Sequence, residues 1–234
     1  MKMNVKKVFI ISLIMIAIGG MLFSALFRNG LILDMAGIHL NSLFIKKITV
    51  EEKYARVDRN DNGVADPIDV VQAARKEAEN RTVYKSAYYE GGYPPDGEGV
   101  CTDIIWRGFM GAHIKLKDLM DQDIQRHPHL YPRAKEKPDP NIDFRRVPNQ
   151  HVFFQRLAQS LTTDIVPGDR ENLAEWQPGD IVVYLDGPDH IGIISDKRTK
   201  DGVPYFIHNT PPFASEIKLT SYDSPIAGHF RWNY

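Results

Sequence analysis

Two features of the sequence predict an α+β domain, and a third predicts a membrane helix ahead of it. Residues 70–161 contain segments whose apolar side chains recur at helical spacing, whereas residues 180–232 contain short apolar runs separated by turn residues. Helices followed by an antiparallel sheet are typical of an α+β fold. The third feature is a run of twenty uncharged residues at positions 8–27.

The uncharged run predicts an uncleaved transmembrane anchor. Three lysines precede it within the first seven residues, and Arg28 follows it. At ~1.5 Å per residue, a helix of this length spans ~30 Å, the thickness of a bilayer core. The lysines predict a cytoplasmic N-terminus, so that residues 28–234 lie outside the membrane. Cleavage near Ser24–Ala25 is the alternative, and it predicts a secreted protein.

Length and charge limit the class of protein. A chain of 234 residues is long enough for one medium domain with appendages. Lysine and arginine number 29 against 30 acidic residues, so no basic excess indicates a nucleic-acid partner. We expect four parts along the chain: a cytoplasmic tip with the anchor (1–30), a juxtamembrane stalk (31–57), a loop with a helix (58–80) and the main domain (81–234).

The predicted helices come first in the main domain and just before it. Four segments have apolar residues at helical spacing: Val70–Asn80, Cys101–Met110, Leu116–Gln125 and His151–Leu161. Residues 84–100 are turn-rich and polar, and they lead into the second helix. Residues 126–149 are rich in Pro, Asp, Asn and Arg, which is typical of an irregular loop over a surface or cleft.

The predicted strands follow in the last quarter of the chain. They are Asp180–Leu185, His190–Ser195, Val203–His208 and Gly228–Trp232. A turn near Thr199–Gly202 joins the second and third of them. These two strands therefore form a hairpin in an antiparallel sheet.

Cys101 is the only cysteine, and its surroundings suggest a chemical role. It opens a predicted helix, where unpaired backbone N–H groups and the positive end of the helix dipole favour the thiolate. The alternative is that the thiol is a small buried apolar group. A lone cysteine cannot form a disulfide within the chain, so it is either buried or used.

Two histidines give the cysteine the partners that nucleophilic catalysis requires. His190 opens one strand and His208 lies near the end of the next, and opposite side chains on antiparallel strands are ~5 Å apart. A nucleophilic cysteine needs a base to take its proton and a polar group to orient that base. The N-terminus of the Cys101 helix also offers N–H donors to an oxyanion.

These residues resemble a known family when they are taken together. The motifs resemble, in order and spacing, those of NlpC-type papain-like cell-wall peptidases, and the resemblance covers residues 84–234. A closer resemblance is to the domain-of-unknown-function family 1287, a branch of that superfamily, through the segments Pro94–Asp103 and Asp139–Val147. The motifs are Tyr88-x-x-Gly91-Gly92, Cys101, Pro178-Gly179-Asp180, His190-Ile191-Gly192-Ile193 and Phe206-Ile207-His208.

The resemblance implies a papain-like fold and a role for each catalytic residue. Cys101 is implied to be the nucleophile, His190 the base and His208 the residue that orients the base. Tyr88 is implied to contact the oxyanion or the substrate. The cell-wall enzymes carry Asp-Cys-Ser-Gly at the nucleophile, where this chain has Val100-Cys101-Thr102-Asp103, so the binding of a substrate amine would pass to Asp103.

Three further polar residues are candidates for binding substrate. Arg145 and Arg146 lie in the irregular loop and could bind a carboxylate of a peptide stem. The alternative for this loop is a surface segment held by internal salt bridges. Asn209 follows His208 and is a candidate for oxyanion or substrate binding.

The Asp/Asn-rich segment 58–69 fits a twelve-residue calcium loop. It has oxygen-bearing residues at the ligand positions and a glycine at position 6. Position 12 is aspartate rather than the usual glutamate. The alternative is a metal-free helix start with Asp66 as the cap and Pro67 at the first position. The candidate calcium ligands are Asp58, Asn60, Asn62, the Val64 carbonyl, Asp66 and Asp69.

The sequence therefore predicts a membrane-anchored thiol hydrolase that cleaves peptide or amide bonds in cell-wall peptidoglycan. No cofactor is expected for the catalysis, and calcium is expected as a structural ion. One alternative makes Cys101, His190 and His208 the ligands of a catalytic zinc ion. Another is a binding module that holds a cell-envelope glycan or peptide without turning it over.

Overall fold

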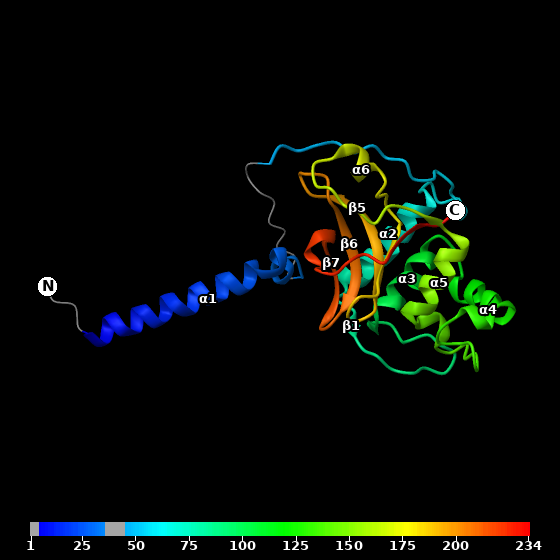
Figure 1. Ribbon diagram of the computed structural model, residues 1–234, viewed down its shortest axis with the longest axis horizontal. Coiled ribbons are helices and arrows are strands. Elements are labelled where there is room, and N and C mark those ends of the chain that lie inside the picture. Colours follow the sequence, from blue (N-terminus) through cyan, green and yellow to red (C-terminus); the bar gives the residue numbers. More distant parts are fainter. Residues whose placement is uncertain (1–4, 36–44) are drawn as a thin grey trace.

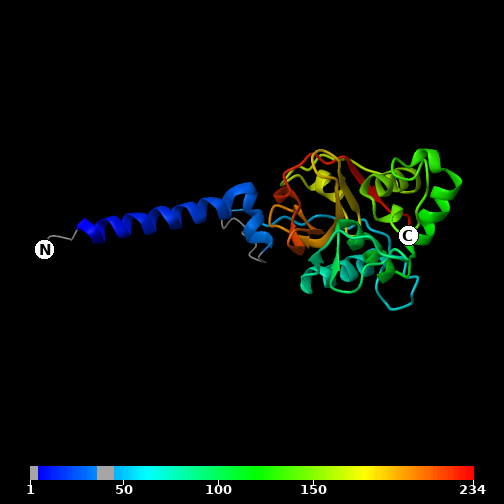
Figure 2. The same ribbon diagram turned by 90° about the horizontal axis from the view of Figure 1, so that it is seen from below.

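The protein is described here by a computed structural model that covers residues 5–35 and 45–234. A long N-terminal helix, α1 (Val5–Met35), extends away from a domain in which helices pack against one curved sheet (Figure 1). Figure 2 shows the same arrangement from below, with the C-terminal end of α1 close to the sheet. The predicted cytoplasmic tip (residues 1–4) and part of the predicted stalk (residues 36–44) lie outside the described residues.

The helices of the domain follow the predicted order. Helix α3 begins at Cys101, as the sequence predicts. Helix α2 begins four residues earlier than predicted, with Pro67 in its first turn, where the missing N–H costs no helical bond. The remaining helices cover the same side of the sheet as α3 or its upper edge (Figure 1). Their bounds are α2 (Asp66–Glu79), α3 (Cys101–Gly111), α4 (Leu116–Arg126), α5 (Val147–Leu157) and α6 (Arg170–Ala174), with short 3₁₀ turns at Pro128–Leu130, Asp143–Arg145 and Leu219–Ser221.

The sheet has eight strands in the order β2-β1-β7-β6-β5-β4-β8-β3. The four predicted strands are present as β4, β5, β6 and β8. The sheet is mixed rather than purely antiparallel, because β1 pairs with β2 in parallel. The bounds are β1 (Val83–Tyr84), β2 (Glu98–Gly99), β3 (Gln159–Ser160), β4 (Ile181–Tyr184), β5 (His190–Arg198), β6 (Pro204–Thr210), β7 (Phe213–Lys218) and β8 (Gly228–Arg231).

The two faces of the sheet bury separate apolar cores. Ile191, Ile193 and Ile207 point toward α3 and pack with Cys101 in the larger core. The residues that alternate with them, such as Phe206, face the other side and pack in a smaller core. This alternation follows from the two-residue period of a strand. It places neighbouring residues of β5 on opposite faces.

Close packing between α3 and the sheet depends on a small residue in the helix. A side-chain carbon built on Gly108 would lie 2.7 Å from the Ile193 side chain and 3.2 Å from the Val70 carbonyl oxygen. A larger residue there would displace the end of the Ile193 side chain and press against the Val70 carbonyl. The glycine therefore lets α3 lie directly on the strand that begins at His190.

The predicted transmembrane anchor requires correction. Helix α1 contains residues 8–27, but among the residues that the structure describes no helix is long and apolar enough to cross a membrane. The predictions of a transmembrane helix and of a single-pass membrane location are wrong on this finding.

Candidate functional site

Cys101 is held at the N-terminus of α3 with its sulfur among backbone N–H groups. The residue before it, Val100, has an extended backbone and serves as the helix cap. The N–H groups of Cys101, Thr102 and Ile191 all donate toward the sulfur and stabilise its thiolate. Two of these donors belong to the helix start, and the third belongs to β5.

Burial outweighs these donors in the resting protein. Only 6% of Cys101 is exposed, and desolvation raises the pKa of its thiol from 9.0 to about 12. The negative charge of Asp103 raises the pKa further. The neutral thiol is therefore the resting form, in contrast to the thiolate that the helix start alone predicts.

His190 and His208 form a hydrogen-bonded pair. Nε2 of His190 lies 2.7 Å from Nδ1 of His208, and their rings are nearly perpendicular. On its other side, Nε2 of His208 lies 3.2 Å from the hydroxyl oxygen of Ser215 on β7. Among the hydrogen bonds of the described residues, none involves Nδ1 of His190. That nitrogen is the one left to accept a proton.

Both imidazoles are neutral at rest because they are buried. Desolvation lowers the pKa of His190 from 6.5 to about 4. The pKa of His208 is lowered well below its usual range by desolvation and by the neighbouring His190. Tyr222 stacks on the His190 ring with 4.7 Å between the ring centres and 15° between the planes, which shields it from water.

The cysteine and the histidine pair meet across β5. The N–H that points at the Cys101 sulfur belongs to Ile191, the residue directly after His190. Among the described residues, no hydrogen bond joins the thiol itself to the His190 ring. The next residue of β5 therefore contacts the nucleophile, whereas the His190 ring packs with Tyr184, Phe206 and Tyr222 on the face of the smaller core.

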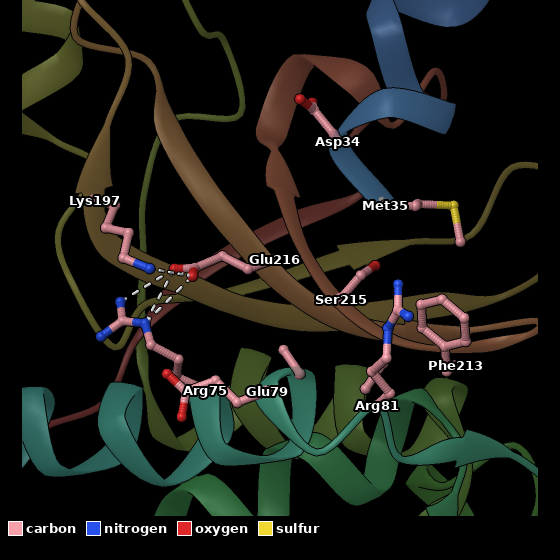
Figure 3. A pocket seen from close by; sticks show the side chains of 11 residues that line it. Asp34, Met35, Arg75, Glu79, Arg81, Lys197, Phe213, Ser215 and Glu216 are labelled. Carbon is pink, nitrogen blue, oxygen red and sulfur yellow. Dashed lines mark hydrogen bonds and ion pairs between the residues drawn. The ribbon is translucent and has the colours of Figure 1, made fainter. Parts of the chain in front are cut away.

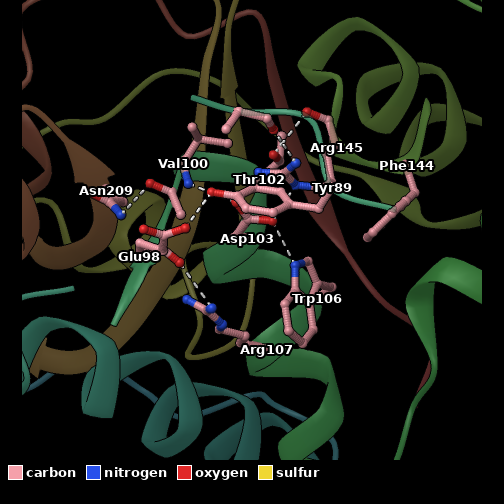
Figure 4. Close-up of polar contacts among 12 residues, drawn as sticks. Tyr89, Glu98, Val100, Thr102, Asp103, Trp106, Arg107, Phe144, Arg145 and Asn209 are labelled. Atoms are coloured by element: carbon pink, nitrogen blue, oxygen red, sulfur yellow. Dashed lines mark hydrogen bonds and ion pairs between the residues drawn. The ribbon is translucent and has the colours of Figure 1, made fainter. Parts of the chain in front are cut away.

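Asp103 and Arg145 bind each other rather than the solvent. Two hydrogen bonds of 2.7 and 2.8 Å join the guanidinium to the carboxylate, and both side chains are buried. The carboxylate also accepts from the Val100 N–H at 2.7 Å and from the Trp106 indole at 2.8 Å (Figure 4). Four donors surround this one carboxylate, so the pair fixes the start of α3 beside the nucleophile.

Asn209 ties the segment before the nucleophile to β6. Its amide nitrogen donates to the Gly99 carbonyl oxygen at 3.1 Å, two residues before Cys101 (Figure 4). Its side-chain oxygen is buried and has no hydrogen-bond partner among the described residues. Asn209 therefore positions the segment just before Cys101, and its side-chain oxygen can still accept a hydrogen bond.

Arg146 lies in the irregular loop, and Tyr88, from the turn-rich segment 84–100, contacts that loop. The Tyr88 hydroxyl donates to the Asp139 carboxylate at 3.1 Å, and the tyrosine is more than half exposed. Arg146 lies 3.5 Å from Asp143. Tyr84 on β1 pairs with Gly99, two residues before the thiol, and burial raises the pKa of its phenol, with further increases from the charges of Cys101 and Asp103.

Tyr84 is a site residue that sequence reasoning missed. Its position gives a signal in retrospect, because it lies on a strand that pairs with β2 opposite Gly99. The Tyr-x-x-Gly-Gly motif points to Tyr88 instead, four residues further along. The spacing of the local motif does not show which tyrosine lies near the cysteine. The parallel pairing of β1 with β2 decides it.

A cavity of about 510 Å³ opens beside the histidine pair. His208 and Tyr222 line it from the sheet side. Asp186 and Asp223 line its rim, and Met35 at the end of α1 closes another part. The cavity gives the buried histidine pair access to a small group from outside.

The 58–69 loop is folded by contacts among its own side chains. Asp58 accepts hydrogen bonds from the Asn62 and Gly63 N–H groups, and the Asn60 amide donates to Asp69 at 2.9 Å. Among the described residues, no group of three or more His, Cys, Asp or Glu side chains is arranged to hold a metal ion. Asp66 pairs with the Arg59 guanidinium at 3.3 Å. Calcium binding stays a prediction.

Comparisons with known proteins identify one family and one curated relative. A family model described as "Domain of unknown function (DUF1287)" matches residues 71–232. The "Uncharacterized protein YijF" of Escherichia coli (strain K12) is 34% identical over 171 residues, which cover 70% of this chain and 80% of that protein. No solved structure matches this chain.

Proposed function

Because this chain belongs to the DUF1287 family, whose description assigns no activity, we propose from its site geometry that it is a thiol hydrolase cleaving peptide or amide bonds. One observation carries the proposal. Nε2 of His190 is engaged by His208 at 2.7 Å, while the next residue of β5 donates its N–H to the Cys101 sulfur. A base with one nitrogen fixed and one nitrogen open, one residue along β5 from the N–H that contacts a helix-start thiol, supplies the groups that nucleophilic catalysis needs.

The proposed reaction starts from two neutral groups. The sulfur attacks the carbonyl carbon, its proton passes to Nδ1 of His190, and the carbonyl oxygen takes the electron pair. The helix-start N–H groups at Cys101 and Thr102 are placed to stabilise that oxyanion. The C–N bond then breaks as His190 returns the proton to the leaving amine, and water later hydrolyses the thioester.

The resting contacts set one requirement for this chemistry. Because no hydrogen bond among the described residues joins the thiol to the His190 ring, substrate binding has to bring the two together. The cavity that His208 and Tyr222 line offers a small group an approach to the histidine pair.

Peptide stems of cell-wall peptidoglycan are the substrate class we propose. Support comes from the resemblance of the Cys101, His190 and His208 motifs to those of NlpC-type cell-wall peptidases. The test is mass spectrometry of purified muropeptides after incubation with wild type, Cys101→Ala and His190→Ala. We expect new cleavage products with wild type only. Identical products from wild type and Cys101→Ala would rule out the thiol as nucleophile.

A zinc-dependent hydrolase receives less support from the histidine geometry. The facing nitrogens of His190 and His208 lie 2.7 Å apart, and a zinc ion needs ~2.0 Å from each ligand nitrogen. An ion therefore cannot sit between them in this arrangement. Chelator-insensitive turnover that iodoacetamide abolishes is the result that the thiol mechanism requires.

A non-catalytic binding module is the second candidate function. The observation that favours it is the burial of Cys101, whose thiol pKa of about 12 opposes thiolate formation. This candidate predicts that muropeptides bind wild type and Cys101→Ala with the same affinity and that neither protein releases products. Calorimetric binding combined with the mass spectrometry above separates the two functions.

A further inference from the structure

The structure assigns to Ser215 the role of a positioning residue that sets the tautomers of both histidines, an inference that rests on the proposed function. Ser215 lies on β7 directly opposite His208 on β6. Its hydroxyl oxygen is 3.2 Å from Nε2 of His208, and only 5% of the residue is exposed. A hydrogen-bonded chain thus runs across three strands, from Ser215 through His208 to His190.

The direction of this chain decides whether His190 can act as a base. A neutral imidazole carries one N–H and one lone pair. If His190 is to take a proton at Nδ1, its own N–H must be on Nε2 and must donate to Nδ1 of His208. His208 then carries its hydrogen on Nε2, and that N–H must donate to the Ser215 hydroxyl oxygen.

The opposite direction produces an inactive arrangement. When the Ser215 hydroxyl donates to Nε2 of His208, the hydrogen of His208 moves to Nδ1. His190 must then accept at Nε2 and carry its own hydrogen on Nδ1, where no lone pair remains for the thiol proton. The direction of the hydrogen bond at Ser215 therefore determines whether Nδ1 of His190, at the other end of the chain of hydrogen bonds, can take a proton.

Among the described residues, His208 is the hydrogen-bond partner of the Ser215 hydroxyl. The adjacent Glu216 carboxylate is occupied by Arg75 at 3.1 Å, Lys197 at 2.7 Å and the Ser195 hydroxyl. Figure 3 shows Ser215 lining a cavity of about 440 Å³ together with Arg75, Lys197 and Glu216. Ser215 therefore both lines this cavity and contacts His208.

A matched pair of variants isolates the hydroxyl from the shape of the side chain. Ser215→Thr keeps the hydroxyl, and Ser215→Val fills the same space without it. The branched side chains of both suit a strand position. Ser195→Ala serves as the control, because Ser195 is another buried serine of the same sheet, and its hydroxyl bonds to Arg75, Glu216 and its own strand.

The direct readout is the tautomer of each histidine in long-range ¹H–¹⁵N correlation spectra at neutral pH. We expect His190 and His208 to carry hydrogen on Nε2 in wild type and in Ser215→Thr. We expect mixed tautomers in Ser215→Val, with unchanged tautomers in the Ser195→Ala control. Hydrogen on Nδ1 of His208 in wild type, or identical spectra for the Thr and Val variants, would overturn the assignment.

Activity supplies the second readout and separates this inference from the proposed function. On a cleaved muropeptide we expect Ser215→Val to lower kcat about tenfold, the typical effect of one lost hydrogen bond, with KM unchanged and with Ser215→Thr restoring kcat. Equal kcat for the two variants contradicts the role of the hydroxyl. Absence of turnover in wild type contradicts the proposed function, while the spectra still test the tautomers.

Discussion

At the scale of single residues, the chemistry of Cys101 depends on two opposing effects. The helix start and the backbone N–H groups favour the thiolate by about 1 kcal/mol, a typical effect of a helix terminus. Burial raises the thiol pKa by about three units, from 9.0 to about 12, which corresponds to about 4 kcal/mol. Desolvation is the stronger of the two effects, so the resting nucleophile is a neutral thiol.

The raised pKa predicts slow alkylation of Cys101 in the folded protein. At pH 8 we expect iodoacetamide to react at least tenfold more slowly with native protein than with urea-unfolded protein, because less thiolate is present and the thiol is 6% exposed. The rate in the native protein should keep rising with pH above 9. Mass spectrometry of timed samples measures both rates. Faster alkylation of native protein at neutral pH would contradict the burial argument.

Asp103 and Arg145 form a structural ion pair within the protein. Both are candidates for binding a charged substrate by sequence, yet each neutralises the other inside the protein. Arg145 also donates to the Ala87 carbonyl at 2.9 Å, so it links the turn-rich segment to the helix that carries the nucleophile. A buried pair of this kind is costly to break, because either partner alone would be an uncompensated charge.

At the scale of secondary-structure elements, the start of α3 is built from three separated segments. Asp103 closes the helix start onto the Val100 N–H, and Asn209 of β6 holds the Gly99 carbonyl. A side-chain carbon built on Gly99 would lie 2.9 Å from the Asp103 carboxylate. The absence of a side chain at this position lets the strand β2 end directly against the helix that Cys101 begins.

The loop before α2 is the element for which we propose a structural calcium ion. Asp58, Asn60 and Asn62 already fold around the loop amides, and Asp69 accepts from both asparagines. Helix α2 packs Val70 in the main core, so order in the loop is linked to the domain. Calcium that binds only the folded state stabilises it by about 2.7 kcal/mol at a hundred times its dissociation constant.

Melting curves with calcium and with chelator test this proposal. We expect a higher Tm in calcium for wild type, and no calcium effect for Asp58→Asn. Asp61→Asn is the matched control, because Asp61 lies in the same loop outside the ligand positions and asparagine tolerates its positive φ of 54°. Equal melting of wild type in calcium and in chelator, measured by calorimetry, would remove calcium from the description of this protein.

At the scale of the whole molecule, burial of the histidine pair couples stability to pH. In the folded protein the pKa of His190 is about 4, against an ordinary value of 6.5. The unfolded chain therefore binds more protons between pH 6.5 and 4, and the free energy of unfolding falls as the pH drops through that range. Above pH 6.5 both states hold His190 neutral, and its contribution is fully present.

We expect the free energy of unfolding to fall by about 3 kcal/mol between pH 7 and pH 4 through His190 alone, the value of about two and a half pKa units. His190→Gln should flatten this part of the profile, since glutamine does not titrate. Urea unfolding at half-unit pH steps measures both profiles. His151→Gln is the control, because burial also lowers the pKa of His151, far from the histidine pair in sequence. A profile of His190→Gln parallel to wild type would contradict the assigned shift.

The sequence by itself determined the order of helices and strands and the motifs of the site. The helix that begins at Cys101 and the strands that carry His190 and His208 are where apolar periodicity places them. These features depend on local spacing and on turn residues, which a linear pattern contains. The same local reasoning predicted a transmembrane anchor, which the described residues contradict.

Only the tertiary structure decided which of the polar residues near the site are open to a substrate. Tyr84 rather than Tyr88 lies near the thiol, because β1 pairs in parallel with β2, a pairing that no spacing reveals. Arg145 reaches Asp103 across 42 positions of sequence, and Ser215 reaches His208 through β7, a strand that the sequence did not predict. Burial decided the protonation states, because desolvation depends on every element packed around a group and not on its neighbours in the chain.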